Sequence, residues 1–242
     1  MDEQGYEQTY ESLAAFLDRL PGGFPPSETG EHVRLLRYLF TPEEAALAVH
    51  LTLDAESPEA IAARASIPPD ETAALLEQMA IKGLIRSVEA GDGPRRYHAL
   101  PWVVGISELQ LYRLDRDYLG RLNTYYRTQT QRPEIATTPQ MRVVPVGESI
   151  GFVPETLPHQ RIGALVESQD RFAVMECICR KMEGLIDRAC KAPLETCLTF
   201  GDWADYVVRT GRGRAIERAE VFEILRRADE ANLVLEPSNS RD

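Results

Sequence analysis

Apolar positions spaced three and four residues apart recur through the first half of the chain, and this spacing predicts amphipathic helices. The first such helix ends at the proline- and glycine-rich run 21–26. We therefore expect an N-terminal helical arm within residues 1–40. Its apolar face consists of Tyr6, Tyr10, Leu13, Leu17 and Leu20.

Sharper helix-start signals follow at Thr41. The run Thr41-Pro42-Glu43-Glu44 combines an N-cap, a first-turn proline and a capping-box glutamate. A second start at Ser57-Pro58-Glu59 predicts a short helix, and a third helix is expected over 70–82, with Gly83 after its end. The order of these elements is typical of a helix-turn-helix.

Two strands joined by a tight turn are expected next. Residues 84–88 and 95–100 have strand composition, and Gly91-Asp92-Gly93 lies between them. Three helices and a hairpin predict a winged helix-turn-helix domain over 41–128. It would end in one long amphipathic helix over 107–128, an element that commonly builds a dimer interface, so we expect a homodimer.

The remainder of the chain predicts a second module. Residues 128–140 are polar, hold two prolines and lack periodicity, so we take them as a linker. Residues 141–242 are expected to form a small, loop-rich and mostly helical module. Its elements would be an extended segment at 142–146 and helices near 158–169, 202–210 and 217–231. The predicted fold is mainly α, within the α+β class.

The charge distribution bears on what a winged helix would bind. The chain has a formal net charge of -11, and residues 1–60 hold 12 acidic but only 3 basic side chains. The helix that would enter a DNA groove, 70–82, carries three acidic residues and one lysine. The wing offers Arg86, Arg95 and Arg96 for phosphate contacts. We favour a protein-docking platform, with DNA binding as the alternative.

Other classes of protein find little support. No apolar run approaches the roughly 20 residues needed to cross a bilayer, and the N-terminus is acidic, so we expect a cytoplasmic protein without membrane insertion. The four histidines include no pair spaced for a metal site, and no Gly-x-Ser-x-Gly nucleophile motif occurs. An enzymatic role is therefore not favoured.

The strongest chemical signal is a cluster of cysteines. All four cysteines of the chain, Cys177, Cys179, Cys190 and Cys197, lie within 21 residues. In a reducing compartment this clustering points to metal before disulfides. Four thiolates complete either an iron–sulfur cluster or a tetrahedral zinc site. Structural zinc sites prefer cysteine pairs with two to four intervening residues, so the uneven spacing here favours the cluster.

Basic residues next to the cysteines agree with an anionic metal centre. Arg180, Lys181, Arg188 and Lys191 lie beside the expected ligands, where they would favour thiolates and raise a cluster's reduction potential. We therefore favour a [4Fe–4S] cluster. Structural zinc and metal-free thiols remain the alternatives.

The chain resembles the winged-helix iron–sulfur proteins of anaerobic bacteria that are described as 4Fe–4S ferredoxin-type proteins. The likeness runs over most of the sequence. It is carried by Gly23-Phe24-Pro25, Leu35-Leu36-Arg37-Tyr38-Leu39-Phe40-Thr41-Pro42-Glu43-Glu44-Ala45, Val143-Val144-Pro145-Val146, Cys177-Ile178-Cys179-Arg180, Cys190, Pro193-Leu194-Glu195-Thr196-Cys197-Leu198 and Phe200-Gly201.

The resemblance implies that the four cysteines are the cluster ligands, with Arg180, Pro193 and Gly201 shaping the loop around them. It implies electron transfer or redox sensing through docking on a redox protein, without conversion of a substrate. Relatives commonly continue into further cysteine-rich ferredoxin motifs, whereas this sequence stops at Asp242, so we expect one cluster. The alternatives are a redox- or metal-responsive winged-helix transcriptional regulator and a structural zinc-binding docking protein.

Overall fold

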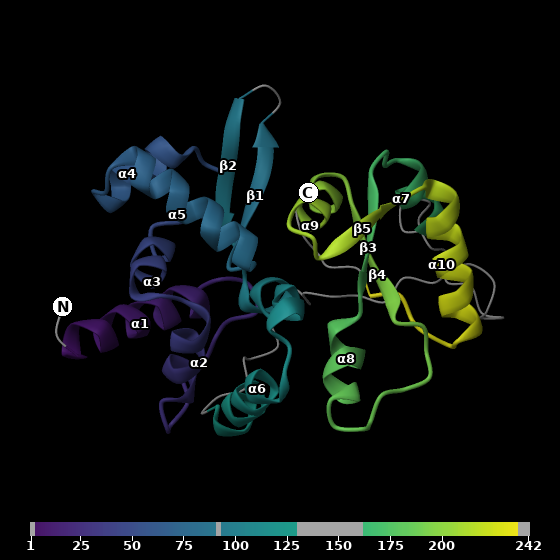
Figure 1. The fold of residues 1–242 in the computed structure, drawn as a ribbon, viewed down its shortest axis with the longest axis horizontal. Helices are drawn as coiled ribbons and strands as arrows, with labels where there is room; N and C mark the ends of the chain where they lie inside the picture. Colours follow the sequence, from purple (N-terminus) through teal and green to yellow (C-terminus); the bar gives the residue numbers. More distant parts are fainter. Residues whose placement is uncertain (1–2, 91–92, 130–161, 237–242) are drawn as a thin grey trace. The chain divides into compact units, whose positions relative to one another are not determined.

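The chain divides into two units, Met1–Thr137 and Thr138–Asp242. The computed structural model describes residues 3–90, 93–129 and 162–236 (Figure 1). Both units mix helices with small antiparallel sheets, so the predicted α+β class is confirmed at that level. Within the described ranges, no helix combines the length and the apolar character needed to cross a membrane.

The first unit places helices before and after one β-hairpin. In chain order its elements are α1 Glu3–Asp18, α2 Glu31–Leu39, α3 Pro42–Ala48, α4 Pro58–Ala65, α5 Pro69–Lys82, β1 Ile85–Ala90, β2 Gly93–Ala99, the irregular helical turns η1 Trp102–Ile106 and η2 Glu108–Arg113, and α6 Arg116–Thr128. The strands β1 and β2 pair antiparallel from Ile85 opposite Ala99. The predicted helices near 42–51, 58–65 and 70–82 and the two hairpin strands are all present.

Local capping explains where these helices begin and end. Thr41 and Glu44 form the expected capping box: the Thr41 hydroxyl accepts from the Glu44 N–H, and the Glu44 carboxylate accepts from the Thr41 N–H. Ser57 caps α4 through the N–H of Ala60. Gly83 ends α5 in the left-handed conformation, with a φ of 74°.

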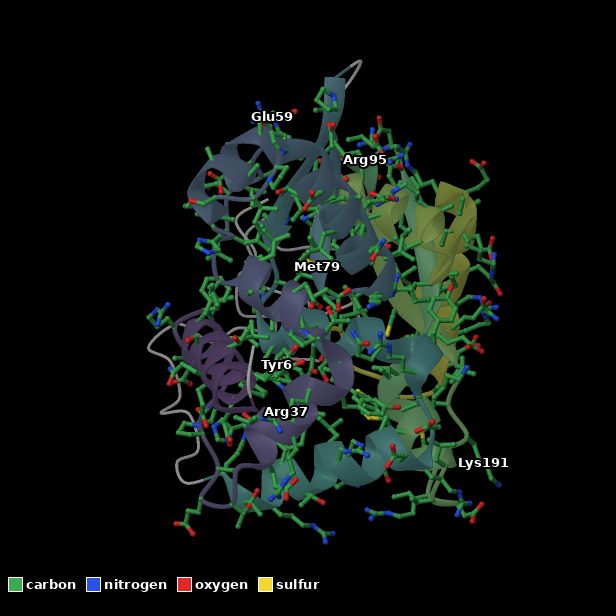
Figure 2. The ribbon with its side chains drawn as sticks, turned by 60° about the vertical axis from the view of Figure 1, so that its left-hand side comes forward. Tyr6, Arg37, Glu59, Met79, Arg95 and Lys191 are labelled. Atoms are coloured by element: carbon green, nitrogen blue, oxygen red, sulfur yellow. The ribbon has the colours of Figure 1, made fainter. Side chains whose placement is uncertain are left out.

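Helix α2 is an element that the sequence did not predict. It follows Gly30, which adopts the left-handed conformation and provides no side-chain cap, so the usual N-terminal signal is missing. Its apolar face nevertheless supplies fully buried core residues, including Leu35 and Leu36. Met79 of α5, labelled in Figure 2, is fully buried, and α5 packs on α4 and β1.

The single long helix predicted over 107–128 is wrong. Leu114 is extended, and the Asp115 carboxylate accepts the N–H of Tyr118, so α6 begins only at Arg116. An aspartate cap restarts the helix because it satisfies an N–H that would otherwise lack a partner. Tyr118 and Tyr125 are completely buried, and α6 packs on α2 within the same unit. The homodimer stays a prediction.

The second unit is built on a three-stranded antiparallel sheet in the order β4-β3-β5. The sequence predicted a small, loop-rich and mostly helical module, and the structure adds this sheet, which the sequence did not predict. Its elements are α7 Ile162–Glu167, β3 Phe172–Glu176, α8 Ile178–Gly184, β4 Glu195–Phe200, α9 Asp202–Arg209, β5 Gly213–Ile216 and α10 Arg218–Glu230. The predicted helices near 202–210 and 217–231 correspond to α9 and α10.

Helices cover the sheet on both faces (Figure 1). Phe172 and Val174 of the central strand pack with α7 and α10 through Val166, Val221 and Ile224. The residue between them, Ala173, is fully buried on the other face, where α9 packs on the sheet. This alternation is the period of two that a strand imposes.

Several sequence predictions fall on residues outside the described ranges. These are the tip of the hairpin turn at 91–92, most of the linker 128–140, the start of the second module at 141, the extended segment 142–146, and the first part of the helix 158–169. Residues 162–167 of that last helix are described, and they are helical.

Candidate metal centre

The site of the four cysteines is formed at one end of the central strand of the second unit. Cys177 follows the last residue of β3 and is the N-cap of α8, so Cys177 and Cys179 lie on either side of the first helical residue. Cys197 lies in β4 opposite Met175. Because β3 and β4 are antiparallel, residues that are 20 positions apart in sequence meet at the same end of the sheet.

The pairing of β3 with β4 is irregular at the end of the sheet that carries the cysteines. Met175 pairs with Cys197, but the next residue, Glu176, pairs with Glu195, so Thr196 is an extra residue in the ladder. A β-bulge of this kind bends the strand and redirects its side chains. Beyond the bulge, the N–H of Cys177 donates a 2.8 Å hydrogen bond to the carbonyl oxygen of Leu194.

Three of the four thiols converge directly. The Cys177 thiol is within hydrogen-bonding reach of the thiols of Cys179 and Cys197. Hydrogen bonds from these two thiols, with a further one from the backbone N–H of Arg180, hold the pKa of Cys177 well below its ordinary value. The pKa of Cys197 is raised, first by its hydrogen bond with Cys177 and then by burial.

Cys190 is connected to the other cysteines only indirectly, through its interaction with Arg180. It is exposed in the segment between α8 and β4. The N–H of Ala192 lowers the pKa of its thiol, with a smaller contribution from the guanidinium of Arg180. The interaction that links Cys190 to the other three cysteines therefore runs through an arginine on α8.

Arg180 also contacts the strand that carries Cys197. Its Nη1 donates to the carbonyl oxygen of Pro193 at 3.0 Å and to the hydroxyl of Thr196 at 2.6 Å. The Pro193 carbonyl and the bulge residue are thus both held against α8. Its Nε is buried and has no hydrogen-bond partner among the described residues.

The other basic residues are placed less centrally. Lys181 forms an ion pair with Glu176, and Arg188 forms one with Glu183 at 3.3 Å. Lys191 is exposed and lies at the outer edge of the second unit in Figure 2. Only Arg180 of the four predicted cations is shown acting on the thiols themselves.

Gly201 acts at the far end of β4. It lies four residues from Cys197, roughly 13 Å along a strand. Its φ of 54° is in the left-handed region, and its N–H donates to the carbonyl oxygen of Arg171 at 2.9 Å. Gly201 therefore ends the strand and starts α9, and the prediction that it shapes the cysteine loop is not supported by these contacts.

The residue types of the four cysteines suit a metal centre better than their present positions do. Four thiols match the ligand sets of iron–sulfur clusters and of structural zinc. Within the described ranges, no group of three or more histidine, cysteine, aspartate or glutamate side chains is placed so that it could hold a metal ion. A bound metal would therefore require the cysteine side chains to move closer together, Cys190 among them.

The sequence did not single out Thr196 as part of this site. Its role depends on the bulge in β4, and a bulge leaves no distinct signature in a short run such as Glu195-Thr196-Cys197. The four cysteines and Arg180, by contrast, are recognisable from residue type and proximity alone.

No family model, curated protein or solved structure matches this chain.

Proposed function

We propose that this protein is an iron–sulfur protein in which one [4Fe–4S] cluster is held by Cys177, Cys179, Cys190 and Cys197. The observation that carries the proposal is the arrangement at the end of β3, where Cys177 caps the helix that contains Cys179 and Cys197 lies opposite Met175. Arg180 ties that helix to the segment between Cys190 and Cys197. Such a cluster supplies one-electron transfer when bound. The protein would pass an electron to a docked redox partner or report redox state, and it would not convert a substrate.

The environment of the thiols supports an anionic centre. The N–H groups of Arg180 and Ala192 donate to the sulfurs of Cys177 and Cys190, and amide hydrogen bonds of this kind stabilise thiolates. Hydrogen bonds to the sulfurs also set the reduction potential of a cluster. The backbone around the site is therefore arranged to hold negatively charged sulfur.

Exposure supports electron exchange with another protein. Cys179 and Cys190 are exposed, whereas Cys177 and Cys197 are partly buried. A cluster on these ligands would have one side in the protein and one side toward solvent. A single cluster needs a donor or an acceptor on another protein, and a surface site permits that approach.

The first unit provides a candidate docking platform. Its order of three helices and a hairpin supports a winged helix-turn-helix domain, in which α5 is the element that would enter a DNA groove. The exposed residues of α5 include Asp70, Glu71, Gln78 and Ile81. An acidic and partly apolar face is better suited to a protein than to phosphates, so a redox-responsive transcriptional regulator is the less favoured proposal.

Structural zinc is a second candidate because of the spacing of the thiols. Tetrahedral zinc with Zn–S bonds of about 2.3 Å holds its sulfurs roughly 3.8 Å apart, which is comparable with the separation of hydrogen-bonded thiols. A cubane holds its ligands farther apart, because its irons and sulfides lie between them. Zinc and a cluster would therefore require different separations of the four cysteine sulfurs.

Anaerobic purification distinguishes these candidates. We expect a broad absorbance near roughly 400 nm that bleaches with dithionite, with roughly four irons and four sulfides per chain. The variants Cys177→Ser and Cys197→Ser should lose the colour, whereas Ser168→Ala, a change at an exposed residue of the same unit, should keep it. A colourless wild-type protein with one zinc per chain would replace the redox proposal with the structural one.

A further inference from the structure

Arg180 occupies a position that no other basic residue near the cysteines shares. From α8 it reaches the Pro193 carbonyl and the Thr196 hydroxyl, and it contacts the thiol of Cys190. One side chain thus joins the helix that contains Cys179 to both ends of the segment 190–196. Loss of these contacts would release that segment from α8.

One donor of the Arg180 side chain makes no hydrogen bond with the described residues. The Nε of Arg180 is buried and lacks an acceptor among the described residues. A buried donor without a partner costs free energy, and such groups in native proteins commonly have a role at a site. An acceptor at the cysteine site that carries negative charge would relieve this cost and would also neutralise the guanidinium.

We infer that Arg180 is the positioning residue of the cysteine site, which holds the Cys190–Cys197 segment in place and raises the reduction potential of the cluster bound there. This inference rests on the proposed function. A fixed positive charge stabilises the reduced state, which carries one more negative charge than the oxidised state, so the potential rises. Arg188 provides the contrast, since its side chain is 72% exposed and pairs with Glu183 instead.

The potential of the loaded protein tests the role of the charge. We expect Arg180→Gln to lower the equilibrium constant for reduction about tenfold, which is about 59 mV for one electron. Arg180→Lys keeps the charge and should stay closer to the wild type. Arg188→Gln should shift the potential far less, because the Arg188 side chain is exposed to solvent and paired with Glu183. Equal potentials for Arg180→Gln and Arg188→Gln in an anaerobic redox titration would overturn the assignment of the potential to Arg180.

Alkylation of the metal-free protein tests the positioning role independently. Iodoacetamide labelling followed by mass spectrometry should modify Cys197 several-fold faster in both Arg180 variants than in the wild type or in Arg188→Gln. The side-chain nitrogens of glutamine and lysine lie fewer bonds from the backbone than the Arg180 Nη1, which donates both hydrogen bonds, so neither residue reaches both acceptors. Unchanged labelling would refute the positioning role. A wild-type protein without iron would remove the proposed function and the potential together, and the labelling rates alone would then decide whether Arg180 organises the thiols.

Discussion

A methyl group added at Gly213 would lie 2.7 Å from the carbonyl oxygen of Val174, closer than side-chain carbons approach backbone atoms. Gly213 lies opposite Met175 where β5 pairs with β3. The absence of a side chain at this position therefore lets β5 approach the central strand of the second unit. Gly213 therefore has a packing role in the sheet.

Gly213→Ala should destabilise the second unit by about 1–3 kcal/mol, because the backbone of β3 would have to shift to admit the methyl group. The matched control is Gly163→Ala in α7, where nothing lies within 4 Å of the added carbon. That change should be neutral or slightly stabilising, because alanine favours helix. Denaturant unfolding of both variants checks the difference, and equal midpoints would contradict the proposed close approach.

In the first unit, Glu44 combines a capping role with a buried ion pair. Its carboxylate accepts from the Thr41 N–H at 2.8 Å and from the Lys82 ammonium at 2.6 Å, and its side chain is only 1% exposed. Glu44→Ala should cost about 2–4 kcal/mol, since it removes one partner of a largely buried pair. Glu43→Ala, at the exposed neighbouring position, should cost far less. Thermal unfolding measures both, and similar losses would exclude a special role for Glu44.

These two examples show what the sequence could and could not predict about the fold. The capping box at Thr41 is a local pattern, so the start of α3 was predicted correctly. The sheet of the second unit was missed because β5 has only four residues, Gly-Arg-Ala-Ile, without an alternating pattern. The apolar run of β3 is too short to be assigned to a strand by periodicity. Its strand character depends on pairing with β4 and β5.

For the candidate site, too, some features were predictable from the sequence and others were not. The cysteines and their basic neighbours are recognisable because they are close in sequence. Their meeting at one end of β3 depends on the register of β4 and on the bulge at Thr196. The reach of Arg180 to Pro193 depends on that same register. Spacing alone therefore indicated the candidate ligands, but it could not separate Arg180 from Lys181.

The stability of the first unit should fall in acid through Glu56. The pKa of this carboxyl is lowered mainly by its hydrogen bonds with Arg64, at 2.9 and 2.6 Å, and further by Thr52. A pKa that is lower in the folded state stabilises the fold above the unfolded value, about 4.5, and this contribution is lost as the pH falls through the folded pKa.

Glu56→Gln should therefore lower stability slightly at pH 7, by less than about 1 kcal/mol for such an exposed pair. It should also flatten the loss of stability below about pH 4.5. Urea unfolding midpoints at pH 7, 4 and 3 give this profile, with Glu71→Gln as an exposed control. An acid profile identical to that of the wild type would show that another group controls acid unfolding.

Two of the three hairpin arginines, Arg86 and Arg95, are not free to contact phosphates, so the hairpin should not support strong DNA binding. Arg95 is paired with Glu89 at 2.7 Å and with Glu77 at 3.7 Å, and Arg86 is only 5% exposed. Phosphate contacts would first have to break these arrangements. We therefore expect no binding of a mixed-sequence duplex between roughly 50 and 200 mM salt, measured by fluorescence anisotropy.

The double variant Glu77→Gln with Glu89→Gln should release Arg95 and allow weak binding with a salt slope near about -1, as expected for a single phosphate contact. Glu71→Gln, which changes the charge by one without touching Arg95, should bind no better than the wild type. The comparison separates the release of one arginine from a general loss of negative charge. Steep, salt-dependent binding by the wild-type protein would instead favour the transcriptional regulator, because several phosphate contacts would then be made despite the acidic face of α5.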